Sequence, residues 1–223
     1  MDKKLLRCFV LFLLATWIAV VQVSAGDDPA HTIRVEDFSR FKVGTFPEGW
    51  KSRGGDGSEV YSVKAGSESY LEAKAVRSAI GIAKDFEYDP SAYPFLSWDW
   101  RVFELPKGGD ERYKQTGDSA AAVYVVFSGR LRPNNIKYVW SASLPIGTTT
   151  ESPYNSKTKI VVLQTQSTPP ATWVSQKVNV YEDYRRLFGD EPVHVQAVGL
   201  MSDSDNTESQ AIADYKEIRI SRQ

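Results

Sequence analysis

The segment Phe95–Val102, which reads FLSWDWRV, alternates between two kinds of side chain. Successive residues of a β-strand point to opposite faces of the sheet. Trp98 and Trp100 therefore share one face of the predicted strand, and Asp99 and Arg101 share the other. This alternation is typical of a strand that turns one face to a core and the other to water.

Short apolar or alternating runs recur along the chain, and Gly, Pro, Asn and Asp residues separate them. Many short strands with turn signals between them favour a sandwich or a barrel. We therefore predict an all-β fold, a jelly-roll-like antiparallel β-sandwich with one short helix. The expected strands are Thr32–Asp37, Val60–Val63, Tyr70–Ala75, Ile80–Lys84, Phe95–Val102, Ala120–Phe127, Ile136–Ala142, Lys159–Leu163, Thr172–Asn179, Val193–Met201 and Ala211–Ile220.

One segment has helical signals. Asn179 can cap a helix over residues 180–188, Glu182 stands at the capping-box position, and Gly189 can close the C-terminal end. Tyr184 belongs to an apolar stripe that repeats every three to four residues. We expect this stripe to pack the helix across an open edge or end of the sandwich.

The first 25 residues have the three parts of a secretory signal peptide. A basic start precedes the apolar run Cys8–Val21, and Val23-Ser24-Ala25 supplies the small residues that a signal peptidase recognises. We predict a signal peptide over residues 1–25 and a single β-sandwich domain over residues 26–223, located in the periplasm or outside the cell. The apolar run is shorter than the roughly 20 residues of a spanning helix, so no stable membrane span is expected after cleavage.

Composition limits the classes of function. The chain has a net charge of −1, and residues 1–25 carry three basic residues and one acidic residue, so their removal leaves −3. A mildly acidic surface without basic runs argues against a nucleic-acid partner. The only cysteine is Cys8, so the predicted exported domain can form no disulfide. His31 and His194 are the only histidines, and we find no catalytic signature.

Aromatic residues of the predicted strands form one candidate ligand site. Aromatic faces on a concave sheet can stack on sugar rings, and a few polar groups can then orient the ligand. The alternative is that the same rings form the hydrophobic core. The candidate residues are Trp98, Trp100, Arg101, Asp118, Tyr124, Tyr138 and Trp140.

Two groups of acidic residues are candidates for ion or ligand binding. Asp203, Asp205 and Asn206 lie in the densest cluster of the hard oxygen ligands that calcium prefers, although such side chains also bond their own backbone in turns. Glu36 and Asp214 lie on the first and last predicted strands, and we expect their carboxylates to meet if those strands pair. Two close carboxylates need a cation, a shared proton or an arginine, so a structural calcium is one candidate there.

Several longer motifs resemble a known family. The motifs are Phe46-Pro47-x-Gly49-Trp50, Leu96-x-Trp98-x-Trp100-Arg101-Val102, Gly117-Asp118-x-Ala120-Ala121, Tyr138-Val139-Trp140, Val178-Asn179-Val180-Tyr181-x-Asp183-Tyr184-Arg185 and Met201-Ser202-Asp203-Ser204-Asp205-Asn206-Thr207. They are similar to the domain-of-unknown-function 3047 family, from about Phe38 onward. This resemblance implies a secreted bacterial protein and assigns no catalytic residue. The acidic residues on the first and last strands also resemble the termini of jelly-roll carbohydrate-binding modules, which often hold a structural calcium.

Three functions are consistent with these features. We expect an exported, non-catalytic protein that binds a glycan or another cell-envelope component. One alternative is an enzyme that acts on envelope polysaccharide through carboxylates, which requires two facing acids in a cleft and a raised carboxyl pKa. The other is a structural or partner-binding envelope protein, which requires a contiguous exposed apolar patch.

Overall fold

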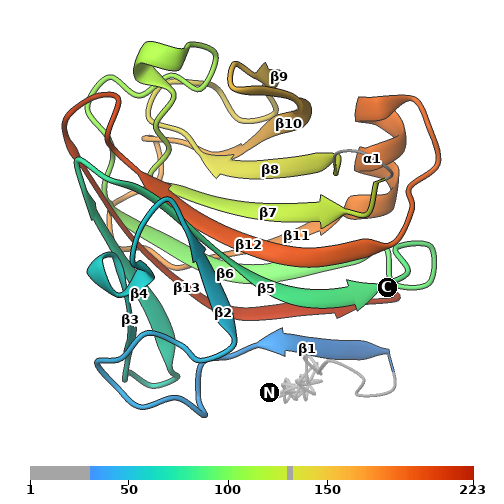
Figure 1. The fold of residues 1–223 in the computed structure, drawn as a ribbon, viewed down its shortest axis with the longest axis horizontal. Helices are drawn as coiled ribbons and strands as arrows, with labels where there is room; N and C mark the ends of the chain where they lie inside the picture. The colour runs from blue at the N-terminus through green and yellow to red at the C-terminus, as the bar shows by residue number, and fades with distance from the viewer. Residues whose placement is uncertain (1–30, 130–132) are drawn as a thin grey trace, which may run out of the picture.

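A computed structural model describes residues 31–129 and 133–223. Within these ranges the chain forms two β-sheets, one α-helix and two short 3₁₀ turns at Gly57–Glu59 and Lys114–Thr116. The two sheets stack face to face (Figure 1), which confirms the predicted jelly-roll-like β-sandwich. The predicted signal peptide, residues 1–25, lies outside the described residues.

Sheet A has six strands, and its centre is the last strand of the chain. Two strands share one edge of β13: β1 pairs with its C-terminal part, and β4 pairs with its N-terminal part. The first and last strands therefore pair, which is the condition under which Glu36 and Asp214 were expected to meet. The strands in order are β11 (Val174–Asn179), β6 (Phe95–Glu104), β13 (Gln210–Ser221), β4 (Tyr70–Val76) and β3 (Tyr61–Lys64), with β1 (Thr32–Glu36) beside β13.

Sheet B has seven strands and lies in front of sheet A in Figure 1. Its strands in order are β2 (Trp50–Arg53), β5 (Ala79–Tyr88), β12 (Val195–Asp203), β7 (Ala121–Phe127), β8 (Asn135–Trp140), β10 (Asn155–Gln164) and β9 (Thr149–Ser152). All neighbours in this sheet are antiparallel except β8 and β10, which are parallel. The sheet is therefore mainly antiparallel, as predicted, and the parallel pairing of β8 with β10 is a detail that the sequence did not predict.

The core between the sheets is rich in aromatic rings. Trp98 and Trp100 of β6 point inward, and Tyr138 and Trp140 of β8 meet them from sheet B. The ring centroids of Trp98 and Trp100 are 5.3 Å apart, and those of Trp100 and Trp140 are 5.6 Å apart. None of these four side chains is more than 1% exposed. The alternation that predicts β6 therefore directs its tryptophans into the core.

The single α-helix, α1 (Val180–Phe188), matches the predicted helix. Asn179 caps it by accepting a hydrogen bond from the Glu182 N–H at 3.0 Å, and Gly189 ends it with a φ of 70°. Tyr184 is buried and packs on Phe127 of β7, with ring centroids 4.5 Å apart. In Figure 1 the helix lies at one end of sheet B, beside the ends of β7 and β8.

Every predicted strand is present, but the sequence did not predict β2 and β9. Each has four residues, and they form the two opposite edges of sheet B. Within the described ranges, no helix is long and apolar enough to cross a membrane.

Candidate functional site

The outer face of sheet B carries a groove with a volume of about 810 Å³. Residues that point away from the core on three neighbouring strands make its floor: Gly81 and Ala83 of β5, Gly199 of β12 and Tyr124 of β7. Gly199 pairs with Ala83 on one side and with Tyr124 on the other. Because most of these side chains are small, the floor is low and the surrounding side chains stand above it.

The absence of a side chain at Gly199 lets the Tyr124 side chain lie close to β12. A Cβ atom at Gly199 would lie 3.1 Å from the Ile82 carbonyl oxygen and 3.3 Å from the Tyr124 Cβ. Both distances are tighter than ordinary van der Waals contact. Glycine in a strand often marks such a close approach, and here it helps to shape the floor of the groove.

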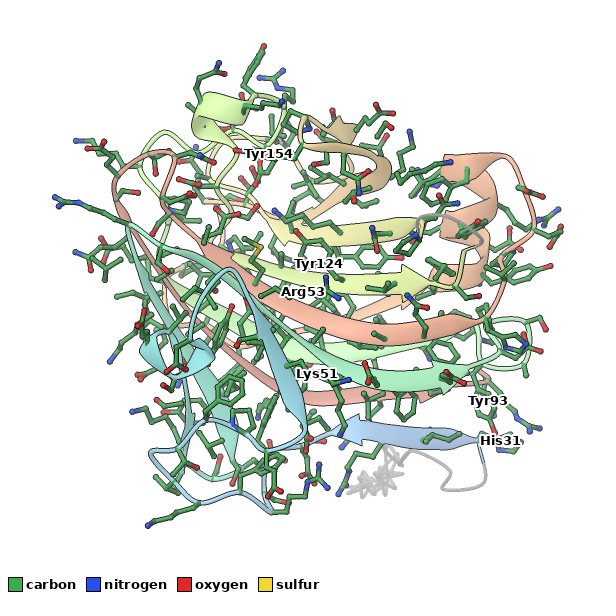
Figure 2. All side chains as sticks on the ribbon, viewed as in Figure 1. His31, Lys51, Arg53, Tyr93, Tyr124 and Tyr154 are labelled. Atoms are coloured by element: carbon green, nitrogen blue, oxygen red, sulfur yellow. The ribbon has the colours of Figure 1, made fainter. Side chains whose placement is uncertain are left out.

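Charged and amide side chains surround this floor. Lys51 and Arg53 come from β2, Asp85 and Glu87 from β5, and Asn135 from β8. Figure 2 shows Lys51, Arg53 and Tyr124 on the same face of the molecule. Lys51 and Asp85 form an ion pair, and their side chains are 70% and 69% exposed. The groove therefore combines one aromatic ring with several accessible hydrogen-bonding groups.

A second hollow of about 330 Å³ adjoins the groove, and we call it the acidic hollow. Tyr124 and Met201 line both spaces. Tyr154, from the turn between β9 and β10, also lines the acidic hollow, and its hydroxyl lies within hydrogen-bond distance of the Asn206 side chain. Figure 2 shows Tyr154 on the same face as Tyr124.

Three carboxylates converge beside the acidic hollow. One oxygen each from Asp118, Asp203 and Asp205 lies within 4.8 Å of the other two. Asp118 is fully buried and accepts hydrogen bonds from the Thr207 N–H at 2.8 Å and the Asn206 N–H at 3.3 Å. Asp203 ends β12 and is 7% exposed, whereas Asp205 is exposed.

The neighbouring groups push the pKa values of two of these acids in opposite directions. Burial raises the pKa of Asp203 well above its ordinary value, Lys137 opposes the shift, and Asp118 adds to it. Burial also acts to raise the pKa of Asp118, but hydrogen bonds from Asp203, Thr207 and Asn206 outweigh it and lower that pKa. Opposite shifts in neighbouring acids are typical of a shared proton or of a site for a cation.

Lys137 is a cation that lies beside these acids. It extends from the outer face of β8, is 5% exposed, and places its Nζ 3.9 Å from the Asp203 Oδ2. The Nζ also donates a hydrogen bond to the Ser119 Oγ at 3.1 Å. Burial acts to lower the pKa of Lys137, but Tyr124, Asp203 and Glu111 outweigh it, so the pKa is raised and the lysine is charged.

The structure divides the predicted aromatic site between two places. Trp98, Trp100, Tyr138 and Trp140 lie in the core and have no surface on which a ligand could stack. Tyr124 alone of the five aromatic candidates lines the groove. Alternation could not separate them, because both faces of the Ala120–Phe127 strand are apolar.

Three other predicted residues lie away from the groove. Arg101 lies on the outer face of sheet A, where its guanidinium is 4.4 Å from the Trp173 ring centroid and forms an ion pair with Asp214 at 2.6 Å. Glu36 instead forms an ion pair with Lys84 at 2.8 Å. Although β1 and β13 pair, Glu36 lies opposite Ile218, four residues from Asp214. Each carboxylate therefore has its own cation, and the two do not form a common site.

Asp118 and the loop residues Asp203, Asp205 and Asn206 were predicted from separate motifs, and the structure brings them together. Sequence reasoning missed Lys137 and Arg53. A signal for Lys137 was present, because it is the one charged residue in the otherwise apolar run after Asn135. Arg53 gave no signal, since its strand was not predicted.

Together, the fold and the groove define an all-β sandwich protein with a groove on the outer face of sheet B. The family model described as "Protein of unknown function (DUF3047)" matches residues 48–219, and the chain belongs to this family. This match confirms the family that the sequence motifs predicted. No curated protein sequence matches the chain significantly.

Several solved structures are similar in fold. The K2 cleaved adhesin domain of Lys-gingipain is 11% identical, with a TM-score of 0.46, and the match covers 86% of this chain and 98% of that chain. The family 11 carbohydrate-binding module of a cellulosomal cellulase of Clostridium thermocellum is 10% identical, with a TM-score of 0.46 and coverage of 85% and 93%. The family 11 xylanase from Neocallimastix patriciarum is 12% identical, with a TM-score of 0.41 and coverage of 84% and 94%.

Proposed function

We propose that the protein binds a glycan or another cell-envelope component in the groove, without catalysing a reaction. The groove itself is the observation that supports this proposal. Sugar rings present C–H faces that pack on aromatic rings, and hydroxyl groups that hydrogen-bond to charged and amide side chains. The groove offers both kinds of partner, with Tyr124 on its floor and Arg53, Glu87 and Asn135 around it.

The distribution of acids favours binding over catalysis. A carboxylate-dependent glycosidase needs two carboxyl groups that flank the bond to be cleaved. The acidic residues that line the groove, Asp85 and Glu87, both come from β5 and so approach a ligand from one side. In the neighbouring cluster, Asp118 is fully buried and bonded to the loop. Release of reducing sugar from envelope polysaccharide by the purified protein would contradict the proposal.

A groove-filling variant tests the location of the ligand. A Cβ atom at Gly81 would meet its nearest neighbours, the Leu200 oxygen and the Met201 sulfur, at an ordinary 3.8 Å. Gly81→Trp should therefore fold and fill the groove. We expect Gly81→Trp and Tyr124→Ala to weaken binding about tenfold or more in calorimetric titrations, a loss of about 1.4 kcal/mol.

The titrations use ligands chosen from a glycan array and from soluble fragments of peptidoglycan and lipopolysaccharide. Phe103→Trp is the matched control, because it enlarges an exposed ring on the outer face of sheet A. The control should bind like the wild type. Binding that survives Gly81→Trp unchanged would place the ligand outside the groove, and the absence of binding to every ligand would contradict the function.

The proposal also places the protein in the periplasm or outside the cell. Its support is the basic start, the apolar run and the small residues at positions 23–25. N-terminal sequencing of the protein expressed from the full chain should give Gly26 as the first residue. Recovery from the cytoplasm with residues 1–25 intact would contradict this placement.

A further inference from the structure

The carboxylates beside the acidic hollow have the spacing of ligands to one ion. Asp118 precedes β7, Asp203 ends β12, and Asp205 follows in the next loop. One oxygen from each lies within 4.8 Å of the others. Calcium binds oxygens at about 2.3–2.6 Å, so one ion can bridge oxygens up to about 5 Å apart. Among the described residues, this is the one group of three or more potential ligands that satisfies such a spacing.

A second observation is a buried oxygen without a partner. The Asp203 Oδ1 is buried and accepts no hydrogen bond from any residue that the structure describes. Asp203 itself is 7% exposed and lines the acidic hollow. Buried polar atoms are almost always satisfied, and an unsatisfied one calls for an explanation such as a bound ion.

The local charge favours a divalent ion. Three carboxylates face one ammonium group, that of Lys137, which is 3.9 Å from the Asp203 Oδ2. The same lysine is also attracted to Glu111, which is 1% exposed and accepts hydrogen bonds from two serine hydroxyls. Lys137 is therefore shared with Glu111 and cannot pair with all three carboxylates, so the cluster has carboxylate oxygens available for a cation.

We infer that Asp118, Asp203 and Asp205 bind a calcium ion at the margin of the acidic hollow. Calcium suits the site because it prefers carboxylate and amide oxygens and accepts irregular coordination, whereas magnesium demands shorter and more regular bonds. The ion would join the loop before β7 to the loop after β12. This inference is independent of the glycan proposal, since the groove and the cation cluster use different residues.

Calcium binding is measured on the purified protein after a chelator has removed its metal ions. Calorimetric titration with calcium chloride should show one saturable site, and calcium should raise the unfolding temperature. Terbium, which replaces calcium, should show luminescence on excitation of tyrosine, because Tyr124 and Tyr154 line the same hollow. A site that binds magnesium more tightly than calcium would overturn the assignment.

Asp205→Asn is the decisive variant, because Asp205 is exposed and its change leaves the buried network intact. We expect it to lower calcium affinity about tenfold or more, since affinity follows the number of ligand charges. Asp190→Asn, another exposed aspartate in the loop after α1, should bind calcium like the wild type. The absence of saturable calcium binding, or equal calcium affinity of the wild type and Asp205→Asn, would overturn the inference. A proton shared between Asp118 and Asp203 would then explain why their carboxylates lie so close together.

Discussion

Gly81 and Gly199 show how single residues of sheet B shape the groove. Both lie in neighbouring strands on the outer face, and both are in the floor. Their surroundings differ, because a Cβ at Gly81 would have room, whereas a Cβ at Gly199 would crowd the Ile82 carbonyl oxygen. The two positions therefore allow a matched comparison.

Gly199→Ala should destabilise the protein and Gly81→Ala should not. We expect Gly199→Ala to lower the free energy of unfolding by about 1–3 kcal/mol, because the strands must shift to accept the methyl group. Gly81→Ala should change it by about +0.4 to +1 kcal/mol, since it reduces the freedom of the unfolded chain. Urea unfolding checks both values, and equal effects of the two substitutions would contradict the description of the floor.

Asp214 should give the protein a measurable pH dependence. Burial raises the pKa of Asp214 from 3.8 to about 6, although Arg101 opposes the shift. The folded protein therefore holds this proton more tightly than the unfolded chain does. The contribution of Asp214 to stability rises as the pH falls from about 6 to about 4, and is lost as the pH rises through the same range.

Asp214→Asn should flatten the dependence of unfolding free energy on pH between about 4 and 6, because the titrating group is gone. Urea unfolding at a series of pH values measures the slope. Asp190→Asn serves as the exposed control and should keep the wild-type slope. Identical slopes for Asp214→Asn and the wild type would contradict this role.

The candidate site could be predicted from the sequence only in part. Asp203, Asp205 and Asn206 were found because consecutive polar residues stand out, and Asp118 was found within a motif. Their convergence depends on the pairing of β7 with β12, which a single sequence does not show. The failed aromatic assignments have a simple cause, since an aromatic ring on a strand can face either side.

At the scale of elements, α1 shows local signals that the fold retains. The predicted cap forms, but the Glu182 side chain contacts Arg185 at 3.4 Å, so its predicted capping-box role is replaced by an ion pair on the helix surface. The local sequence therefore determined the ends of the helix correctly, while an exposed side chain took a different partner.

Asn179→Ala should destabilise the protein by about 1 kcal/mol, because the Glu182 N–H at the start of the helix loses its acceptor. Glu182→Ala is the matched comparison and should cost only about 0.2–0.5 kcal/mol, the value of an exposed helical pair. Thermal or urea unfolding distinguishes the two. A larger loss for Glu182→Ala would show that the capping box forms after all.

The strands that the sequence missed are short edge strands. β2 reads WKSR and β9 reads TTES, and neither carries the apolar run by which a strand is recognised. Their structure comes from pairing with β5 and β10. The parallel pairing of β8 with β10 was unpredictable for a similar reason, because strand order is a property of the whole sheet.

At the scale of the whole molecule, the sandwich depends on the aromatic layer between its sheets. Trp100 contacts Trp98 within β6 and Trp140 across the core. In the described structure its indole N–H has no acceptor, so the ring contributes through packing alone. If Trp100 belongs to the core, its substitution should lower the free energy of unfolding. If it belonged to a ligand site, substitution should weaken binding and leave that free energy unchanged.

Trp100→Ala should lower the free energy of unfolding by about 3–5 kcal/mol, because it leaves a large cavity between the sheets. Trp100→Phe should cost less, since it keeps a ring in place and removes the unsatisfied N–H. Urea unfolding followed by far-ultraviolet circular dichroism measures both. A Trp100→Ala protein of wild-type stability would contradict the position of this residue in the core.

The pairing of β1 with β13 determines how the fold responds to mechanical load. Thr32 lies opposite Ser221, and the Arg222 N–H donates to the His31 carbonyl oxygen at 3.0 Å. Because the two strands are antiparallel, a force that pulls His31 and Arg222 apart acts on this terminal pair first. Hydrogen bonds would then break one after another, as in the opening of a zipper. Single-molecule stretching should therefore detach β1 at low force, before the sandwich and its groove yield.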